Sequence, residues 1–242
     1  MKKNLFSVFL AIVLSFSLTI RAQVLDSTMA VVSSGSINSS ASVYTMATLN
    51  NTIYLGGSFD YVGPRTGSGV PVDIATGLAK AQFPKVNGTI YTIISDGKGG
   101  WFMGGSFKVI NAADFAFLVH INPNYSLDKS WNPKVKSPIY TLLLSNNILY
   151  VGGSFSSIGD TQRNNIAAID ITSGQITHWN PNADYEVKTI LSANNNIIVG
   201  GRFTQIGGAQ RNFLALLDPV TGLASPWNAF IDQGVSTQTY IK

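Results

Sequence analysis

Short apolar runs that end in two glycines recur along the chain at a fixed spacing. Each run of three residues is followed by Gly-Gly, one variable residue and Phe. The first glycines of these doublets are Gly56, Gly104, Gly152 and Gly200, so the spacing is 48 residues. Self-similarity at a fixed period of this size indicates a repeat architecture. The expected repeats are residues 43–90, 91–138, 139–186 and 187–234, with a partial fifth from 235.

A second apolar run lies upstream of each doublet, and turn residues separate the two runs. In the third and fourth repeats the separators are Asn146-Asn147 and Asn194-Asn195. Asn and Gly accept the positive φ that a two-residue hairpin turn demands. The runs next to the doublets, such as Leu149-Tyr150-Val151, do not alternate with polar residues, which is typical of strands buried on both faces. Each repeat is therefore predicted to begin with a β-hairpin.

Two further strands are predicted in each repeat. The third is clearest at residues 166–170 and 214–218, and the fourth is short and ends on an aromatic residue. Four antiparallel strands in about 48 residues are typical of a β-propeller blade. A helical repeat would instead need a 3.6-residue apolar period, which the mature chain lacks. The aromatic residues that end the fourth strands are Phe83, Trp131, Trp179 and Trp227. The three tryptophans are expected to lie in equivalent environments.

The predicted fold is all-β: a β-propeller of four complete four-stranded blades with partial repeats at both ends, a fragment of a larger ring. Val235 lies 48 residues after Val187, where a fifth repeat would begin. Leu25-Asp26 lies three periods before Ile169-Asp170. Residues 25–42 are therefore expected to form the outer part of a split blade that pairs with the C-terminal end.

The shared motifs resemble a known type of repeat. After Gly-Gly-Ser-Phe come Ile-Gly, Arg-Asn, Ala-x-Ile-Asp, a Gly turn and Trp-Asn-Pro, all in one register. Over residues 43–230 this pattern resembles the delta-sixty type of bacterial β-propeller repeat, and the double glycines also look kelch-like. The first two repeats depart from it, with Gly67-Ser68 and Phe115-Ala116 at the Arg-Asn position. The resemblance implies a long exported surface protein and no catalytic residues.

The first 22 residues have the pattern of a cleaved signal peptide. Lys2 and Lys3 precede an apolar stretch over residues 5–20, and Ala22 stands before Gln23, where the mature chain is expected to begin. The alternative is a membrane anchor, but 16 residues with three serines are short for a span. The chain has no cysteine, which excludes disulfides and a lipid-anchored Cys.

Charge argues against nucleic acid as a partner. The formal net charge is +4, from 16 Lys and Arg against 12 Asp and Glu. Removing the signal takes away Lys2, Lys3 and Arg21, so that 13 bases against 12 acids leave +1. Such a surface has no overall electrostatic footprint for phosphate.

Several residues invite a functional interpretation beside a structural one. The Trp-Asn-Pro triplets at residues 131–133 and 179–181 could offer aromatic platforms to a sugar, although packing between blades suits their large apolar area better. Arg163 and Arg211 could bind anions, but their repetition beside Asp170 and Asp218 favours structural ion pairs or backbone capping. The Gly doublets lack the following helix that a phosphate loop requires.

No catalytic, cofactor-binding or metal-binding constellation is predicted. Hydrolysis normally needs paired carboxylates, and Glu186 is the single Glu in the sequence. Asp96 lies in a segment that faintly resembles the Asp-box of sialidases, but a turn is the better interpretation because the segment occurs once. His120 and His178 occupy unrelated positions in their repeats and do not suggest a metal site.

The preferred functional hypothesis is an exported, non-enzymatic β-propeller that serves as a binding or scaffolding module of a larger cell-surface or secreted protein. Its partner would be a protein or carbohydrate ligand, with no membrane insertion after signal cleavage. The alternatives are a carbohydrate-active enzyme domain with its site in loops on one face, and a structural spacer. The fold itself does not decide among them.

Overall fold

The computed structural model describes residues 32–33, 42–49, 52–59, 61–62, 68–79, 83–109 and 112–229, and all regular elements in these ranges are β-strands. Their main units are four three-stranded antiparallel sheets that follow one another along the chain. Sheet 1 comprises β2 (Ser42–Leu49), β3 (Thr52–Ser58) and β5 (Gly69–Asp73); sheet 2 comprises β6 (Val86–Ser95), β7 (Trp101–Val109) and β8 (Ala112–Ile121); sheet 3 comprises β9 (Ile139–Ser145), β10 (Ile148–Gly153) and β13 (Ile166–Asp170); sheet 4 comprises β14 (Val187–Ala193), β15 (Asn196–Gly201) and β18 (Leu214–Leu217).

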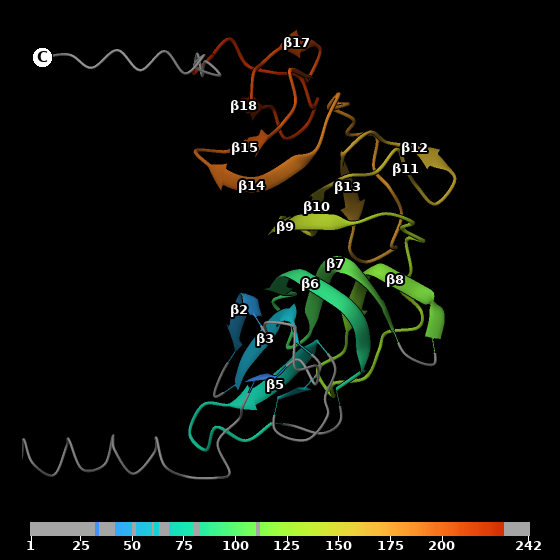
Figure 1. The fold of residues 1–242 in the computed structure, drawn as a ribbon. Helices are drawn as coiled ribbons and strands as arrows, with labels where there is room; N and C mark the ends of the chain where they lie inside the picture. The colour runs from blue at the N-terminus through green and yellow to red at the C-terminus, as the bar shows by residue number, and fades with distance from the viewer. Residues whose placement is uncertain are drawn as a thin grey trace, which may run out of the picture.

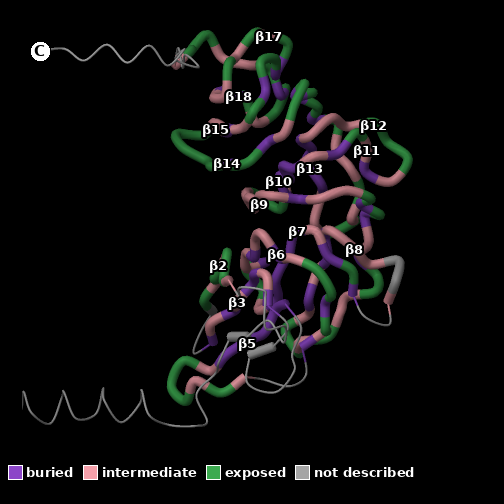
Figure 2. Tube along the Cα trace, viewed as in Figure 1, coloured by how far each residue is buried: buried purple, intermediate pink, exposed green. Residues whose placement is uncertain are grey.

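The four sheets are arranged as an arc (Figure 1). The first strand of each sheet lies on the concave side, and each first strand packs against that of the next sheet. Residues buried in the interior lie mainly between successive sheets, as Figure 2 shows. The expected stacking of repeat units is thus confirmed, while no closed ring is formed by the described residues.

Small two-stranded ladders complete the strand set. Two of them lie in the loop between the second and third strands of sheets 3 and 4, where the sequence has Ile-Gly. A third joins residues 32–33 to residues 61–62 of the first repeat. This part of the expected split blade therefore pairs with its neighbour in sequence, and the rest of residues 25–42 and residues 230–242 lie outside the described ranges. The ladders are β1 (Val32–Ser33) with β4 (Tyr61–Val62), β11 (Ser157–Ile158) with β12 (Thr161–Gln162), and β16 (Gln205–Ile206) with β17 (Ala209–Gln210).

The predicted hairpins are confirmed with their turn chemistry. β9 pairs with β10 and β14 with β15 in antiparallel register. Asn146 and Asn147 have φ of 50° and 62°, and Asn194 and Asn195 have φ of 48° and 60°. Positive φ at both central residues is the geometry that matches the twist of paired strands.

The runs without alternation are buried on both faces, as expected. Leu149 and Val151 of β10 pack into the cluster shared with sheet 2, whereas Tyr150 packs into the cluster shared with sheet 4. Sheet 3 therefore contributes to two cores. The Phe that follows each glycine doublet is also buried, at Phe59, Phe107, Phe155 and Phe203.

The predicted fourth strand of each repeat is wrong in extent. It is reduced to one bridge per repeat, in which Ala79, Leu127, Ile176 and Ala224 pair with the third strand. A tight turn capped by an Asp side chain precedes this bridge in repeats one, three and four. In repeat four, Ala229 stands where the middle repeats have Pro133 and Pro181, and the pairing is still one bridge, so proline does not set this limit.

The expected equivalence of the three tryptophans is also wrong. Trp131 and Trp179 are buried in inter-sheet clusters, but Trp227 is 46% exposed. Trp179 donates from Nε1 to the backbone oxygen of Asp218 in the next repeat, at 3.0 Å. No described sheet follows Trp227, so it has no neighbour against which to bury its ring.

Each sheet carries one β-bulge opposite its glycine doublet. In sheet 3, Gly152 pairs with Thr141 and Gly153 with Ile139, which leaves Tyr140 as the extra residue. The same shift leaves Tyr44, Tyr91 and Lys188 unpaired in the other sheets. A Cβ on Gly153 would overlap the carbonyl oxygen of Pro138, just before the bulge. The doublet is thus required by this close backbone approach.

Adjacent sheets are also joined by a side-chain hydrogen bond next to the bulge. Thr141 Oγ1 in sheet 3 accepts from the backbone N–H of Ile190 in sheet 4, at 3.2 Å. Thr45 Oγ1 accepts in the same way from Ile93 N–H, at 3.3 Å. The threonine after the bulge therefore links sheet 1 to sheet 2 and sheet 3 to sheet 4.

Replacement of Thr141 by Val is expected to destabilise the fold by about 1–2 kcal/mol, because the Ile190 N–H loses its partner while the volume is kept. Chemical denaturation measures the change. The matched control is Thr189→Val, at the equivalent exposed position in sheet 4, with an expected effect within about 0.5 kcal/mol. Equal effects of both variants would show that the inter-sheet bond contributes nothing.

Candidate functional site

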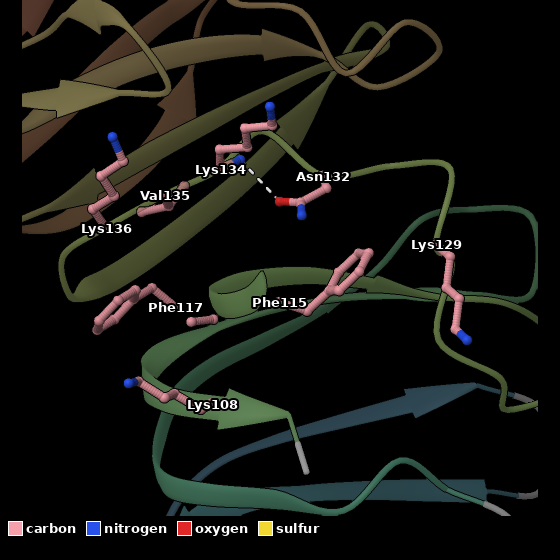
Figure 3. Close-up of a pocket in the computed structure, with 9 residues that line it drawn as sticks. Lys108, Phe115, Phe117, Lys129, Asn132, Lys134, Val135 and Lys136 are labelled. Atoms are coloured by element: carbon pink, nitrogen blue, oxygen red, sulfur yellow. Dashed lines mark hydrogen bonds between the residues drawn. The ribbon is translucent and has the colours of Figure 1, made fainter. Parts of the chain in front are cut away.

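An open pocket lies between sheet 2 and the segment that leads from it to sheet 3 (Figure 3). Its volume is about 890 Å³. One wall is formed by the end of β7 and the start of β8, and the other by residues 129–136. We call it the lysine pocket; it is lined by Lys108, Phe115, Ala116, Phe117, Lys129, Asn132, Lys134, Val135 and Lys136.

Four lysines make the lining strongly basic. All four are exposed, and no Asp, Glu or His is among the lining residues that the structure describes. The ion pairs formed within the described ranges involve His120 and Lys188, and none involves these four lysines. Gathering like charges costs free energy, and an anion in the pocket would relieve that repulsion.

Two phenylalanines give the pocket an apolar component. Phe115 and Phe117 are half-buried and come from β8, across the pocket from Asn132 and Lys134 (Figure 3). The opposite wall is held by Asn132, whose Oδ1 accepts from the backbone N–H of Lys134 at 2.9 Å. Val135 adds a backbone bridge to Ile158 of β11. The lysines on residues 134–136 are therefore carried by an anchored segment.

Two residues that line this pocket have a positive φ, and this conformation recurs at the same positions of other repeats. Phe117 and Lys134 have φ of 64° and 57°. Positive φ recurs 48 residues later at Asn165 and Asn182, and again at Phe213. The conformation is thus structural in origin, and the chemistry particular to this pocket comes from its side chains.

A second pocket in the same arc has a lining without lysines and serves for comparison. It lies beside the segment that joins sheets 3 and 4, with a volume of about 560 Å³. Its lining includes Asn180, Asn182, Gln205 and Gln210 and no charged residue. The basic lining is therefore not a general property of the inter-sheet segments.

The repeat geometry and a family match together identify the domain. Residues 192–222, most of sheet 4 with its loops, match the family described as "Domain of unknown function (DUF5122) beta-propeller". The same three-stranded unit with its bulge precedes it three times in the arc. The four stacked sheets have the architecture of β-propeller blades.

Solved structures similar to this propeller include the extracellular domain of a hybrid two-component system from B. thetaiotaomicron, with a TM-score of 0.53 and 13% identity over 86% of this chain and 24% of that one. The WD40 β-propeller domain of Doa1 has a TM-score of 0.48 and 9% identity, over 78% of this chain and 54% of that one. The computationally designed protein Ika4 has a TM-score of 0.45 and 17% identity, over 70% and 90%. None of the curated proteins compared with the chain matches it.

Membrane-spanning helices are not found in the part of this propeller that the structure describes. The residues expected to form the signal peptide lie outside that part.

The tryptophans and arginines singled out from the sequence contribute to the packing and hydrogen bonding of the fold. Trp131 and Trp179 are each about 4% exposed and form no sugar platform. Arg163 donates to the backbone oxygens of Gln162 and Thr177, both at 2.8 Å, and Arg211 does the same with its equivalents. Backbone capping is therefore the correct alternative for both arginines.

The aspartates expected as partners of these arginines cap turns instead. Asp170 Oδ1 accepts from Ser173 N–H at 2.8 Å, and Asp218 Oδ1 accepts from Thr221 N–H at 2.6 Å. These backbone hydrogen bonds are the main reason why the pKa of each carboxyl group is lowered. Both carboxylates are therefore hydrogen-bonded to turn residues of their own repeats.

His120 is held between two carboxylates in the interior of sheet 2. Nδ1 lies 2.9 Å from Asp128 Oδ2, and Nε2 lies 3.0 Å from Asp96 Oδ2. Burial alone would raise the pKa of Asp128, but hydrogen bonds from Ser130 and His120 outweigh it, so the pKa is lowered. Asp96 also accepts from Gly100 N–H at 2.8 Å, which confirms the turn at this segment. His178 lies apart on the surface, and no group of metal-ligating residues is found in the described ranges.

The lysine pocket was not predicted, because net charge conceals local clustering. A partial signal exists in residues 129–136, which contain three lysines and no acid. Lys108 is 21 positions before Lys129 and reaches the pocket only through the pairing of β7 with β8. Neither its contribution nor that of the two phenylalanines could be inferred from spacing.

Proposed function

We propose that this β-propeller is a non-enzymatic binding module of an exported, cell-surface or secreted protein, and that it binds an anionic ligand in the lysine pocket. The observation that carries the proposal is the set of four lysines around one cavity, without an ion pair to any described carboxylate. Cations gathered in a concave site raise the local concentration of an anionic ligand.

The lining supports binding rather than hydrolysis. An acid and base pair of carboxyl groups is the usual requirement for glycoside cleavage, and the described residues of the lining include no carboxyl group. Lysines at the rim with two half-buried aromatic rings combine charge recognition with apolar contact. This combination suits an anionic ligand that also has an apolar face.

Two sequence features support export and the finer family assignment. Residues 1–22 have the three-part pattern of a signal peptide. The motifs Gly-Gly-Ser-Phe, Arg-Asn and Trp-Asn-Pro, in one register, support assignment of the repeats to the delta-sixty type. The similar structure from B. thetaiotaomicron is an extracellular domain, which agrees with the proposed location.

Reversal of charge at Lys134 and Lys136 together is expected to weaken binding of polygalacturonate or dextran sulfate by at least about tenfold, ~1.4 kcal/mol. Affinity electrophoresis and calorimetry at low and moderate salt measure this, with neutral dextran as the reference. Binding of the native protein should also fall as salt is added, because the lysines are exposed.

The matched control is Lys98→Glu, an exposed lysine at the hairpin turn of sheet 2 and outside the pocket. It changes net charge in the same direction. If Lys98→Glu weakens polyanion binding as much per charge as Lys134→Glu, the pocket is not the site and the proposal is wrong.

A further inference from the structure

The four β-bulges each leave one extra residue in the first strand of a sheet, and these first strands lie on the concave side of the arc. The extra residues are Tyr44, Tyr91, Tyr140 and Lys188, each in the first strand of its sheet. These first strands lie side by side along the inner edge (Figure 1). A bulge turns its residue out of the regular alternation of the sheet and is often used to aim a side chain at a site.

The side chains on the bulges form one continuous row. The rings of Tyr44 and Tyr91 are stacked with centroids 6.2 Å apart, and those of Tyr91 and Tyr140 are 5.4 Å apart. Lys188 Nζ lies 3.6 Å from the centroid of the Tyr140 ring. We call this set the tyrosine row. It spans all four sheets, so its length depends on the stacking of the repeats.

The tyrosine row is accessible and anchored at the same time. Tyr44 is 55% exposed, and Tyr91 and Tyr140 are half-buried. The threonine after each of Tyr44 and Tyr140 bonds to the next sheet, which fixes the backbone beside the row. An exposed row of rings with a fixed spacing loses little side-chain entropy when a ligand binds.

The row has little net charge, unlike the lysine pocket. Lys188, its one cationic member, is paired with Glu186 at 2.8 Å. The tyrosines provide apolar rings, and each phenol can donate and accept a hydrogen bond. Pyranose rings have the complementary surface, with C–H faces and hydroxyl edges repeated along a chain. A polyanion would gain no charge contact here.

We propose that the tyrosine row is a binding strip for a linear, neutral oligosaccharide, separate from the lysine pocket. Successive sugar rings contact successive tyrosines, and the phenol groups bond to sugar hydroxyls. The strip does not rest on the anionic ligand proposed for the lysine pocket, since the two sites share no residue.

The test uses the full mature chain and hexasaccharides from cellulose, xylan, mannan and amylose, with binding measured by calorimetry and saturation-transfer NMR. At least one hexasaccharide should bind, and Tyr91→Ala, in the middle of the row, should weaken it by at least about tenfold. Tyr91→Phe keeps the ring and should weaken it only a few-fold. Thermal melts confirm that each variant is folded.

Two matched controls separate this site from others. Tyr185→Ala removes a tyrosine that is 51% exposed outside the row, and Lys134→Glu with Lys136→Glu disrupts the lysine pocket. Both should leave the affinity for the hexasaccharide unchanged. The proposal is overturned if no hexasaccharide binds, if Tyr185→Ala weakens binding as much as Tyr91→Ala, or if the row binds only peptides from a random library.

Discussion

The variant Gly153→Ala is expected to unfold sheet 3 and with it most of the arc, at a cost above about 4 kcal/mol. The added methyl group would overlap the carbonyl oxygen of Pro138 and crowd the Cα of Ile139, which lies 3.1 Å from the ideal Cβ position. Both atoms are backbone, so neither can move without opening the bulge at Tyr140. Since domains are stable by about 5–15 kcal/mol, such a loss takes up much of the total.

Gly77→Ala provides the matched control. Gly77 has a positive φ of 69°, unlike Gly153, and nothing lies within 4 Å of its ideal Cβ position. Only the conformational cost of a non-glycine residue applies there, about 1–2 kcal/mol. Equilibrium denaturation followed by circular dichroism compares the two variants. If Gly153→Ala costs no more than Gly77→Ala, the doublets are not required by the close approach of the bulge.

The parts of the fold that follow from local chemistry could be predicted. Paired asparagines between apolar runs have few conformations other than a hairpin turn, and the buried Leu149-Tyr150-Val151 run could only be a strand with a neighbour on each face. Because the spacing is fixed at 48 residues, the strand assignment of one repeat could be extended to all four repeats. Stacking of the sheets followed, since each unit has two apolar faces to bury.

The features that depend on exact pairing could not be predicted. A residue in a strand and a residue in a single bridge can be equally apolar. The sequence around Ile176 therefore did not show that its pairing is limited to one bridge. The bulge is a one-residue offset between two strands, visible only in their register. Its sequence trace is the recurring Val/Ile, Tyr/Lys and Thr triplet, as at Ile139-Tyr140-Thr141. Without the register, those tyrosines resemble ordinary strand residues.

The exposure of Trp227 illustrates a limit of repeat reasoning. Identical positions in a repeat have identical local structure, but their burial is decided by the next unit. Trp179 is covered by sheet 4, whereas no described sheet follows Trp227. In a stacked architecture each residue on a sheet face depends on a neighbour that its own repeat does not contain.

Replacement of His120 by Ala is expected to destabilise the protein by about 3–5 kcal/mol at neutral pH, because two carboxylates would lose the group that lies between them. The side chains of His120, Asp96 and Asp128 are 14%, 6% and 19% exposed, so water cannot fully replace the lost contacts. The cavity left against Phe102, whose ring centroid is 4.6 Å from that of His120, adds to the loss. Chemical denaturation at pH 7 measures the effect, and His178→Ala, on the surface, should change stability by less than about 0.5 kcal/mol.

The pH dependence of stability, compared between the native protein and His120→Ala, tests the electrostatic part of this expectation. The pKa of Asp128 is lower in the folded state than in the unfolded one, so its contribution to stability is present above the unfolded pKa and is lost as pH falls through the folded pKa. As pH falls through the lowered pKa of Asp128, this carboxyl group becomes protonated, and the native protein loses the stability that His120 gave to it. The gap in stability between the native protein and His120→Ala should therefore narrow as pH falls below the unfolded pKa of Asp128, until the packing loss is left. A gap that stays constant over this range would mean that His120 acts through packing alone and that its carboxylate partners contribute nothing to the stability of sheet 2.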